Sequence, residues 1–277
     1  MKLADAHMHL FPQGYRRTGH RSLFGAHELE AYDALRASHG IERALAIGYE
    51  TDGLDPDNNS YLRRLAGEHD WLCSLAYVEA GSDPEPETIE RLLHDGHCGL
   101  AIYAPGAAQA QVVRRWPRPI WDLLGVRGAL VSFNARPEAI QLLLGLVREA
   151  PDVAFLFSHL GLPGQISADM TVSALRARLA PLLSLAGCSN VFVKVSGLYA
   201  TSEPSHAYPH RGGEAALRML LDAFGPRQCL WASDFAPALD FVSFPQTIDI
   251  AALDALAPAD RALVFRDNLV RLLDAFD

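Results

Sequence analysis

Short apolar runs alternate with amphipathic segments along most of the chain. Near-continuous apolar runs are typical of parallel strands that are buried on both faces, because neither side of such a strand meets water. The pattern therefore predicts eight strands, most of them fully buried. These strands are Lys2–His7, Ala44–Tyr49, Leu72–Val78, Leu100–Ala104, Ala129–Asn134, Phe155–His159, Val191–Ser196 and Leu230–Asp234.

The segments between these runs repeat their apolar residues with the 3.6-residue period of a helix. Pro137 stands at a favourable first position for one helix, and Gly225–Pro226 ends another. Asn59–Ser60 and Gly40 indicate a helix cap and a helix stop in the earlier units. Four apolar stripes define the later helices: Ile140, Leu143, Leu144 and Val147; Leu175, Leu179, Leu182 and Leu183; Leu217, Leu220, Leu221 and Phe224; and Leu269, Leu272, Leu273 and Phe276.

Eight strands that alternate with helices, without a long linker, predict an α/β fold of one closed (β/α)8 barrel, the TIM barrel. We expect residues 1–277 to form a single domain of this kind. The main rival is a doubly wound open sheet, but neither GxGxxG nor a P-loop follows the first run. The longest connections, Leu10–His27, Tyr103–Pro119 and Gly197–Gly213, all follow strands. Barrel enzymes build their active sites from the loops at that face.

Composition excludes several classes of protein. Of the 277 residues, 49% are hydrophobic and 21% are charged, which is typical of a chain with a large core. The formal net charge of −9 argues against nucleic acid or an anionic membrane as the main partner, because both attract clustered Lys and Arg. No apolar run approaches the ~20 residues of a membrane span, and the N-terminus lacks the apolar segment of a signal peptide. The four cysteines are far apart, so we expect free thiols and a cytoplasmic protein.

Candidate chemistry begins at the end of the first predicted strand, which reads Asp5-Ala-His7-Met-His9. Residues two apart in a strand share a face, so these three side chains are predicted to point into the barrel together. Two imidazoles with this spacing can hold one divalent ion whose other ligands come from other strands. The alternative is a strand end at the surface with two solvated histidines.

Two more predicted strands end in residues suited to acid–base chemistry. The run Phe155–His159 ends in a histidine before a glycine turn, and Leu230–Asp234 ends in a carboxylate. A lone histidine there is more often a hydrogen-bonded packing residue, and an aspartate there can simply cap a turn. Burying a bare carboxylate is costly, so Asp234 needs a partner, a ligand or water. Together with His7 and His9, these residues predict an active site at the mouth of the barrel.

Four segments then occur in a characteristic order: DAHMHL, SHLGLPG, VFVKVSGLY and LWASDFAP. With these motifs the sequence resembles the amidohydrolase-related branch of the amidohydrolase superfamily. That branch includes 2-pyrone-4,6-dicarboxylate lactonase, L-fuconolactonase and aminocarboxymuconate-semialdehyde decarboxylase. The resemblance runs from Asp5 to an ending that begins at Asn268, and it implies a TIM-barrel hydrolase.

The resemblance also implies roles for individual residues. His7 and His9 match the paired histidines that face the metal or the substrate carbonyl. His159 matches the histidine that polarises the scissile carbonyl. Asp234 matches the aspartate that takes a proton from the attacking water and passes it to the leaving group. The seventh-strand motif VKVS is interpreted mainly as structural.

A divalent metal, Zn²⁺ in the first place, is implied by the same resemblance, with His7, His9 and Asp234 as ligands. Many metal-dependent members carry a further histidine at the end of strand five, where this chain has Asn134. An amide oxygen is a weaker ligand than imidazole and suits zinc poorly. Some lactonases of this branch lack that histidine and work without a metal. Two forms of the site stay open: one in which Asn134 or His159 completes a metal shell, and one without metal.

Basic residues follow three of the predicted strands and suit an anionic substrate. Guanidinium groups bind carboxylates through two parallel hydrogen bonds, so these residues would suit an anionic lactone. Together with the family resemblance, a carboxylated or sugar lactone is expected. Arg16, Arg115, His210 and Arg211 are predicted to bind it. Surface loops commonly carry arginines, and most of the basic residues in these loops are expected to face water only. The full set is Arg16, Arg17, Arg21, Arg114, Arg115, Arg118, His206, His210 and Arg211.

The sequence thus predicts a hydrolase that opens a small ester or lactone with activated water, as a monomer or homo-oligomer. One alternative is a metal-dependent decarboxylase of the same superfamily, which the missing strand-five histidine disfavours. Another is a non-catalytic binding barrel, which is disfavoured because all four strand-end residues keep acid–base types. Release of carbon dioxide separates the decarboxylase from the lactonase, and any turnover excludes the binding barrel.

Overall fold

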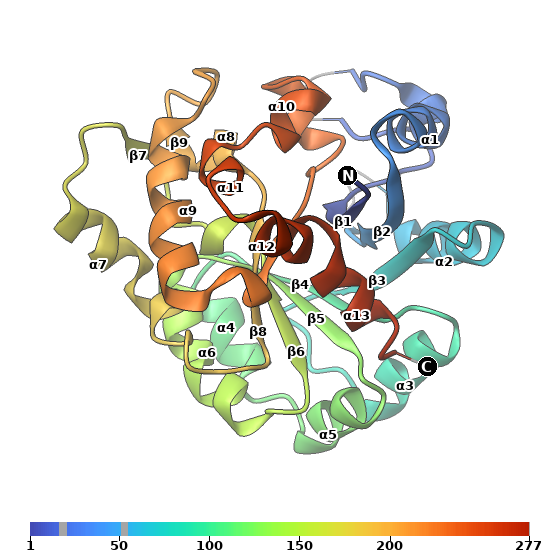
Figure 1. Cartoon of the computed structure of the whole chain (residues 1–277). Coiled ribbons are helices and arrows are strands. Elements are labelled where there is room, and N and C mark those ends of the chain that lie inside the picture. The colour runs from blue at the N-terminus through green and yellow to red at the C-terminus, as the bar shows by residue number, and fades with distance from the viewer. Residues whose placement is uncertain (17–20, 51–54, 277) are drawn as a thin grey trace.

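The computed structural model describes residues 1–16, 21–50 and 55–276. Eight parallel strands form a barrel at the centre of the molecule, and helices surround it (Figure 1). These strands follow one another around the barrel in chain order, which confirms the predicted TIM-barrel fold. They are β1 (Leu3–Met8), β2 (Ile41–Ile47), β3 (Leu72–Val78), β4 (Gly99–Ala104), β5 (Leu130–Ala135), β6 (Ala154–Phe157), β8 (Val191–Val195) and β10 (Cys229–Trp231).

The chain after β10 closes the barrel against β1. The backbone N–H of Asp234 donates to the carbonyl oxygen of His7 over 2.9 Å, and Met8 pairs with Phe235 in parallel register. Both contacts lie beyond the last residue of β10. The barrel is therefore closed by the same segment that carries the candidate carboxylate.

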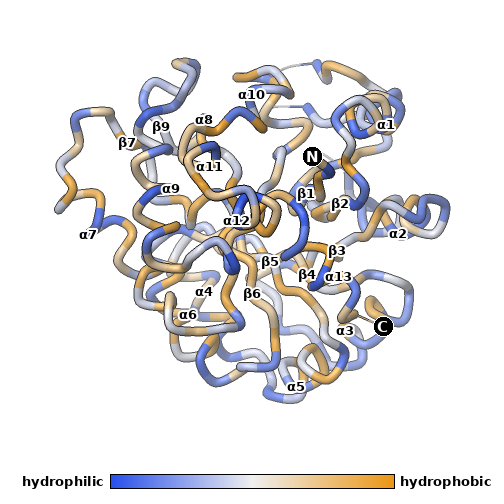
Figure 2. The backbone as a smooth tube through the Cα atoms, viewed as in Figure 1, coloured by the Kyte–Doolittle hydropathy of each residue, from blue (hydrophilic) through white to orange (hydrophobic). Residues whose placement is uncertain are grey.

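Helices connect the strands and cover the outside of the barrel, and Figure 2 shows hydrophobic and hydrophilic residues alternating along them. Three predicted helix ends are confirmed: Gly40 ends α1 in the left-handed conformation, α6 begins at Pro137, and α9 ends before Gly225. The cap predicted at Asn59–Ser60 is wrong, because the helix already begins at Asn58 and the second asparagine bonds to the backbone of β3 instead. No helix in the described part of the chain is long and apolar enough to cross a membrane.

The helices are α1 (Glu28–His39), α2 (Asn58–Glu68), α3 (Pro86–His94), α4 (Ala107–Val113), α5 (Arg118–Val126), α6 (Pro137–Glu149), α7 (Val172–Leu183), α8 (Leu198–Thr201), α9 (Arg211–Phe224), α10 (Phe244–Ile248), α11 (Ala251–Asp254), α12 (Pro258–Ala262) and α13 (Asn268–Leu273). Two short strands that the sequence pattern did not predict, β7 (Ile166–Ser167) and β9 (Ser202–Glu203), pair outside the barrel. A π-helical turn, Leu263–Asp267, precedes α13.

Four of the predicted strands end earlier than expected, and in two of them the difference concerns a candidate site residue. The sixth strand of the barrel ends at Phe157 and the eighth at Trp231, so His159 and Asp234 lie in the following turns. Both residues have positive φ, 52° and 56°, a left-handed conformation that cannot continue a strand. The local backbone thus turns each side chain towards the mouth of the barrel instead of continuing the sheet.

Side chains inside the barrel form layers, because alternate residues of each strand point inward. The lowest layer is apolar, and Leu269 of α13 packs against it. Two residues further along their strands lie Ser132, Ser158 and Lys194, all buried. This polar layer forms the floor of the candidate site. The apolar layer beneath it includes Leu45, Leu75, Leu130, Leu156, Phe192 and Leu230.

Candidate active site

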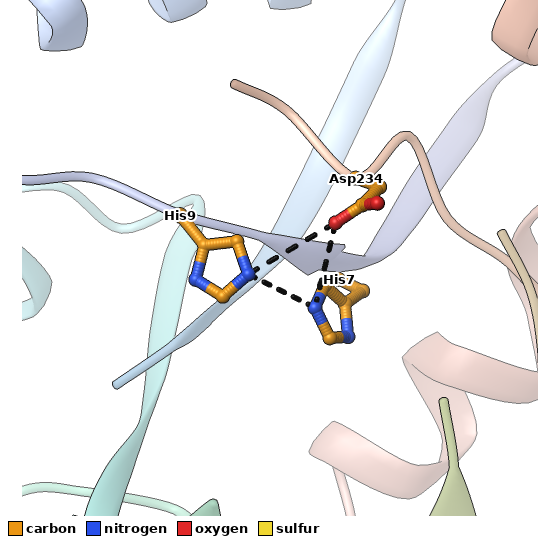
Figure 3. A group of neighbouring side chains, drawn as sticks. All are labelled: His7, His9 and Asp234. Carbon is orange, nitrogen blue, oxygen red and sulfur yellow. Dashed lines mark hydrogen bonds and ion pairs between the residues drawn. The ribbon is translucent and has the colours of Figure 1, made fainter. Parts of the chain in front are cut away.

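Three ionisable side chains converge at the mouth of the barrel. Nε2 of His7 lies 3.1 Å from Nε2 of His9, and Oδ1 of Asp234 lies 3.7 and 4.0 Å from these two nitrogens. Figure 3 shows the two imidazoles at the end of β1 facing the carboxylate on the chain after β10. All three side chains are buried. The structure therefore brings together the three residues that the sequence suggested as metal ligands.

A bulge in β1 decides which residues of the first motif reach the site. The pairing of β1 with β2 shifts register after Asp5, so the simple alternation of side chains is lost. His7 then faces Lys194 inside the barrel, whereas Asp5 accepts hydrogen bonds from Tyr32 of α1 and from Ser233. The prediction that Asp5 shares a face with the histidines is wrong. Its carboxylate instead ties the bulge to the end of the last strand.

Asp234 is held in an orientation suited to a general base. The hydroxyl of Tyr199 donates to Oδ2 over 2.7 Å, which leaves Oδ1 directed towards His7 and His9. Burial raises the pKa of Asp234 to about 6, against the opposing effects of His9, the Tyr199 hydrogen bond and Lys194. The carboxyl group is therefore ionised at neutral pH, but it binds a proton more readily than an exposed aspartate does.

The two histidines of β1 belong to one chain of hydrogen bonds. Nδ1 of His9 lies 2.9 Å from the carbonyl oxygen of Ile47, which can only accept, so Nδ1 carries the proton and Nε2 has a free lone pair. A charged Lys194 can only donate, and its Nζ lies 3.3 Å from Nδ1 of His7 and 2.8 Å from the hydroxyl of Ser132. Nε2 of His7 then donates to Nε2 of His9. In this arrangement every ring nitrogen has a partner.

The ionisation of these groups agrees with that chain. Burial lowers the pKa of His9 to about 4, that of His159 to about 3, and that of His7 well below its ordinary value. Burial also lowers the pKa of Lys194 to about 7. The three imidazoles are thus neutral at physiological pH and can act as hydrogen-bond donors or as ligands.

His159 joins the site from the turn after β6. Its Nδ1 lies 3.0 Å from the hydroxyl of Ser196 and 3.8 Å from Oδ2 of Asp234. Its ring centroid is 4.8 Å from that of His7. Gly197 makes room for it, because a Cβ atom there would lie only 2.6 Å from the imidazole Nδ1. The structure places this predicted residue beside the carboxylate.

The donor set fits a divalent cation on one condition. Ligand atoms separated by 3.1, 3.7 and 4.0 Å can all lie within about 2.0–2.2 Å of one ion. His9 already presents a lone pair, but His7 would have to carry its proton on Nδ1 and donate to Ser158, 3.3 Å away. Lys194 opposes this tautomer, since a metal-bound histidine normally donates its second N–H to an acceptor. The cluster can therefore hold a metal when the lysine does not donate to His7.

A pocket of about 180 Å³ opens above these residues. Aromatic side chains dominate its wall, and four of them are tyrosines. Asn134 also contributes, so the residue at the expected position of a fifth-strand histidine faces the pocket. Among the residues that the structure describes, no Lys or Arg lines it. The lining consists of His9, Phe11, Tyr15, Tyr49, Tyr103, Asn134, His159, Tyr199, Asp234 and Pro237.

The residues predicted to bind an anionic substrate lie elsewhere. Arg16, Arg115 and Arg211 are exposed, and none of them is part of the pocket wall. His210 is buried beside a second, much smaller cavity of about 30 Å³, which lies behind Tyr199, and neither of its ring nitrogens bonds to a described residue. Arg17 lies outside the described residues. A role in substrate binding stays a prediction for this group.

The sequence did not mark Lys194, Tyr199 or Tyr103 as functional, yet all three lie at the site. The lysine did carry a signal. The chain has 24 Lys and Arg residues, and Lys2 and Lys194 are the only lysines among them. A lone lysine inside an apolar strand indicates a position that needs an ammonium group with an adjustable pKa. The tyrosines gave no such signal, because only barrel closure brings them together.

Comparison with known proteins agrees with the class that this fold and site define. The family model described as amidohydrolase matches residues 4–275, so the chain belongs to the amidohydrolase family. A comparison with curated protein sequences gave no match.

Several solved structures share the fold over almost the whole length of both chains. A probable 2-pyrone-4,6-dicarboxylic acid hydrolase from Acinetobacter baumannii, with citric acid bound, has a TM-score of 0.75 at 16% identity and covers 99% of this chain and 100% of its own. An amidohydrolase from Burkholderia multivorans with bound zinc has a TM-score of 0.77 at 18% identity, with 99% of each chain covered. The 5-carboxyvanillate decarboxylase from Sphingomonas paucimobilis has a TM-score of 0.64 at 12% identity, also with 99% of each covered.

Proposed function

We propose that this amidohydrolase opens a small ester or lactone with water activated by Asp234. The observation that carries the proposal is the environment of this carboxylate. One oxygen is held by Tyr199, the other faces two neutral imidazoles, and burial raises the pKa to about 6. A base of this kind accepts a proton from water near neutral pH and can return it within the same turnover. A pocket of about 180 Å³ lies above it, so a ligand in this pocket would contact the carboxylate.

In the proposed reaction, Oδ1 of Asp234 removes a proton from a water molecule as its oxygen attacks the carbonyl carbon of the lactone. His159 lies beside the carboxylate and is neutral, so a ring N–H can donate to the carbonyl oxygen as negative charge develops there. The bond from the carbonyl carbon to the ring oxygen then breaks, and that oxygen takes the proton from Asp234. The product is one hydroxy acid, which ionises and releases one proton.

A divalent metal, with zinc as the first candidate, would be held by His7, His9 and Asp234. When bound, such an ion supplies Lewis-acid stabilisation of negative charge on oxygen. His159 or Asn134 would complete the shell, since both line the pocket. The zinc in the Burkholderia multivorans amidohydrolase supports a metal in this site, whereas the lysine beside His7 favours weak binding or catalysis without metal.

The lactone is proposed on two grounds. The motifs resemble those of lactonases, and one protein with the same fold is described as a probable 2-pyrone-4,6-dicarboxylic acid hydrolase. The fold is also shared with a decarboxylase, so the fold alone does not choose the reaction. The partner we propose is a small-molecule substrate, bound by a monomer or a homo-oligomer.

The proposal is tested with a panel of γ- and δ-lactones, assayed by proton release with a pH indicator and in parallel for carbon dioxide. We expect at least one lactone to be opened without carbon dioxide release.

The assay is repeated on protein treated with a chelator and then given zinc or manganese. Full activity without metal would assign the reaction to Asp234 and His159 alone, whereas activity that returns only with one ion would assign a metal enzyme. Hydrolysis of an amide or phosphoester but of no lactone would refute the lactonase proposal, and carbon dioxide release alone would indicate a decarboxylase.

A further inference from the structure

The hydroxyl group of Tyr103 is buried in the candidate site without a hydrogen-bond partner. Tyr103 lies near the end of β4 and lines the same pocket as His9 and Asp234. Its hydroxyl oxygen bonds to no residue that the structure describes. In the same pocket, the hydroxyl of Tyr199 donates to the catalytic carboxylate. A buried phenol hydroxyl without a hydrogen-bond partner is rare and costly. The hydroxyl of Tyr103 therefore indicates a position where a ligand supplies the partner.

The ring of Tyr103 is held in place by its neighbours. Its centroid lies 4.5 Å from that of Tyr49 and 5.9 Å from that of Tyr77. Across the sheet it is in register with Asn134 of β5, and both side chains line the pocket. A phenol and an amide thus face the pocket from neighbouring strands, and each can donate to or accept from an uncharged oxygen of a ligand.

This polar pair lies across the barrel from the reacting groups. In the order of the strands, β4 is four positions from β10 in either direction. His7, His9 and Asp234 gather where β1 meets the chain after β10. A substrate whose carbonyl lies beside Asp234 would thus direct its substituents towards Tyr103. The pair is placed to recognise a substituent, not to take part in bond breaking.

The charge of the pocket limits which substituents fit. Asp234 is the carboxylate in the wall, and the other described lining residues are aromatic, amide, imidazole or proline side chains. Lys194 lies in the layer below and bonds to His7 and Ser132, so it does not face the pocket. A carboxylate substituent would meet aromatic faces and one negative charge without a described cation to pair with. A hydroxyl group would satisfy the phenol at no such cost.

We propose that Tyr103 is a specificity residue that hydrogen-bonds a hydroxyl substituent of the substrate, and that the site prefers neutral hydroxylated lactones to carboxylated ones. The inference rests on the proposed lactone hydrolysis and names the substrate class for that site. Of the carboxylated and sugar lactones that the sequence left open, it selects the neutral hydroxylated class, against the anionic substrate that the arginine-rich loops suggested.

The test compares three lactones built on one ring: γ-butyrolactone, its γ-hydroxymethyl derivative and its γ-carboxylate. Wild-type protein should open the hydroxymethyl compound with a kcat/KM at least about tenfold above that for the carboxylate. Tyr103→Phe should lower kcat/KM for the hydroxymethyl compound about tenfold and change that for the parent ring by less than about threefold. Tyr77→Phe is the matched control, because this tyrosine packs in the same cluster but does not line the pocket. Thermal melting of both variants shows whether they fold.

Two results would overturn the inference and leave lactone hydrolysis standing. One is faster opening of the carboxylate than of the hydroxymethyl compound by the wild type. The other is a folded Tyr103→Phe variant whose activity is unchanged, or falls equally on the substituted and parent rings. A wild-type protein that opens no lactone, here or in the broader panel, would instead overturn the proposed function and this inference with it.

Discussion

The two walls of the pocket differ in how their polar groups are satisfied. On the side of β1 and β10, the wall contains His9 and Asp234. A chain of hydrogen bonds through His7 to Lys194, in the layer below, holds His9, and Tyr199 holds Asp234. On the side of β2, β4 and β5 the wall consists of Tyr49, Tyr103 and Asn134, and it leaves the buried hydroxyl of Tyr103 without a described partner; we call it the aromatic wall. The first wall is organised before any substrate arrives, whereas the second, in our proposal, is completed by the substrate.

This difference separates chemistry from recognition. Groups that move protons gain from fixed orientation and shifted pKa values, because a reorganising site loses rate. Groups that select a substrate gain from an unsatisfied position, because a wrong ligand leaves it unpaired. Substitutions in the wall that contains Asp234, which we call the catalytic wall, should therefore change kcat. Substitutions in the aromatic wall should change the order in which substrates are preferred.

The largest effect is expected from Asp234→Asn on the catalytic wall. The amide keeps the shape but cannot accept a proton at neutral pH, so kcat should fall by about 10²–10⁴. Asp240→Asn is the control, because Asp240 is exposed and lies close by in sequence. Steady-state kinetics on any lactone identified in the panel measures both. A folded Asp234→Asn variant with kcat within a few-fold of wild type would exclude this residue as the base.

The pH dependence of chelator-treated protein should show the next largest effect. Asp234 acts only when ionised, and its pKa is raised to about 6, so kcat/KM should be level above pH 6 and fall about tenfold per unit below it. Between pH 6 and 4 the loss would reach roughly a hundredfold. Tyr199→Phe should shift the fall in kcat/KM to higher pH. The lost hydrogen bond had stabilised the ionised carboxylate, so its removal raises the pKa of Asp234. A limb near 4, the range of an exposed aspartate, would contradict the buried base.

The smallest effect is expected for metal binding to Lys194→Met. The ammonium group favours the His7 tautomer that cannot ligate and adds positive charge beside the site. Its removal should tighten zinc binding by on the order of tenfold. Lys2→Met removes the other lysine, which is exposed, and should leave zinc affinity unchanged. Competition with a chromophoric chelator measures both variants. Equal affinity in wild type and Lys194→Met would show that the lysine does not oppose the metal.

Most of the barrel was predictable from the sequence because burial on both faces leaves a continuous apolar run. The third strand was predicted with its observed bounds, Leu72–Val78. The errors lie where backbone conformation overrides the apolar pattern. His159 and Asp234 were assigned to strands, but positive φ places them in turns. Side-chain identity could indicate that both residues meet at the mouth of the barrel, but not the turns that aim them.

Part of the candidate site could also be predicted from the sequence. The cluster of His7, His9 and Asp234 followed from motif spacing and family resemblance, because each strand end reaches the same face. The outward turn of Asp5 did not follow, since a bulge is a property of strand pairing and leaves no mark in a single strand. The aromatic wall was also missed, because its residues come from separate strands and have no common motif.

The hydrogen bonds between Asp5 and Ser233 join residues that are 228 positions apart. They make barrel closure a condition for forming the site during folding. Contacts of such long range form slowly, because the intervening chain must first lose its freedom. Secondary structure can return early after dilution from denaturant, but the carboxylate of Asp234 cannot face His7 until the last strand docks against the first. Recovery of activity is therefore expected to report closure of the barrel, because the site is incomplete until the segment after β10 lies against β1.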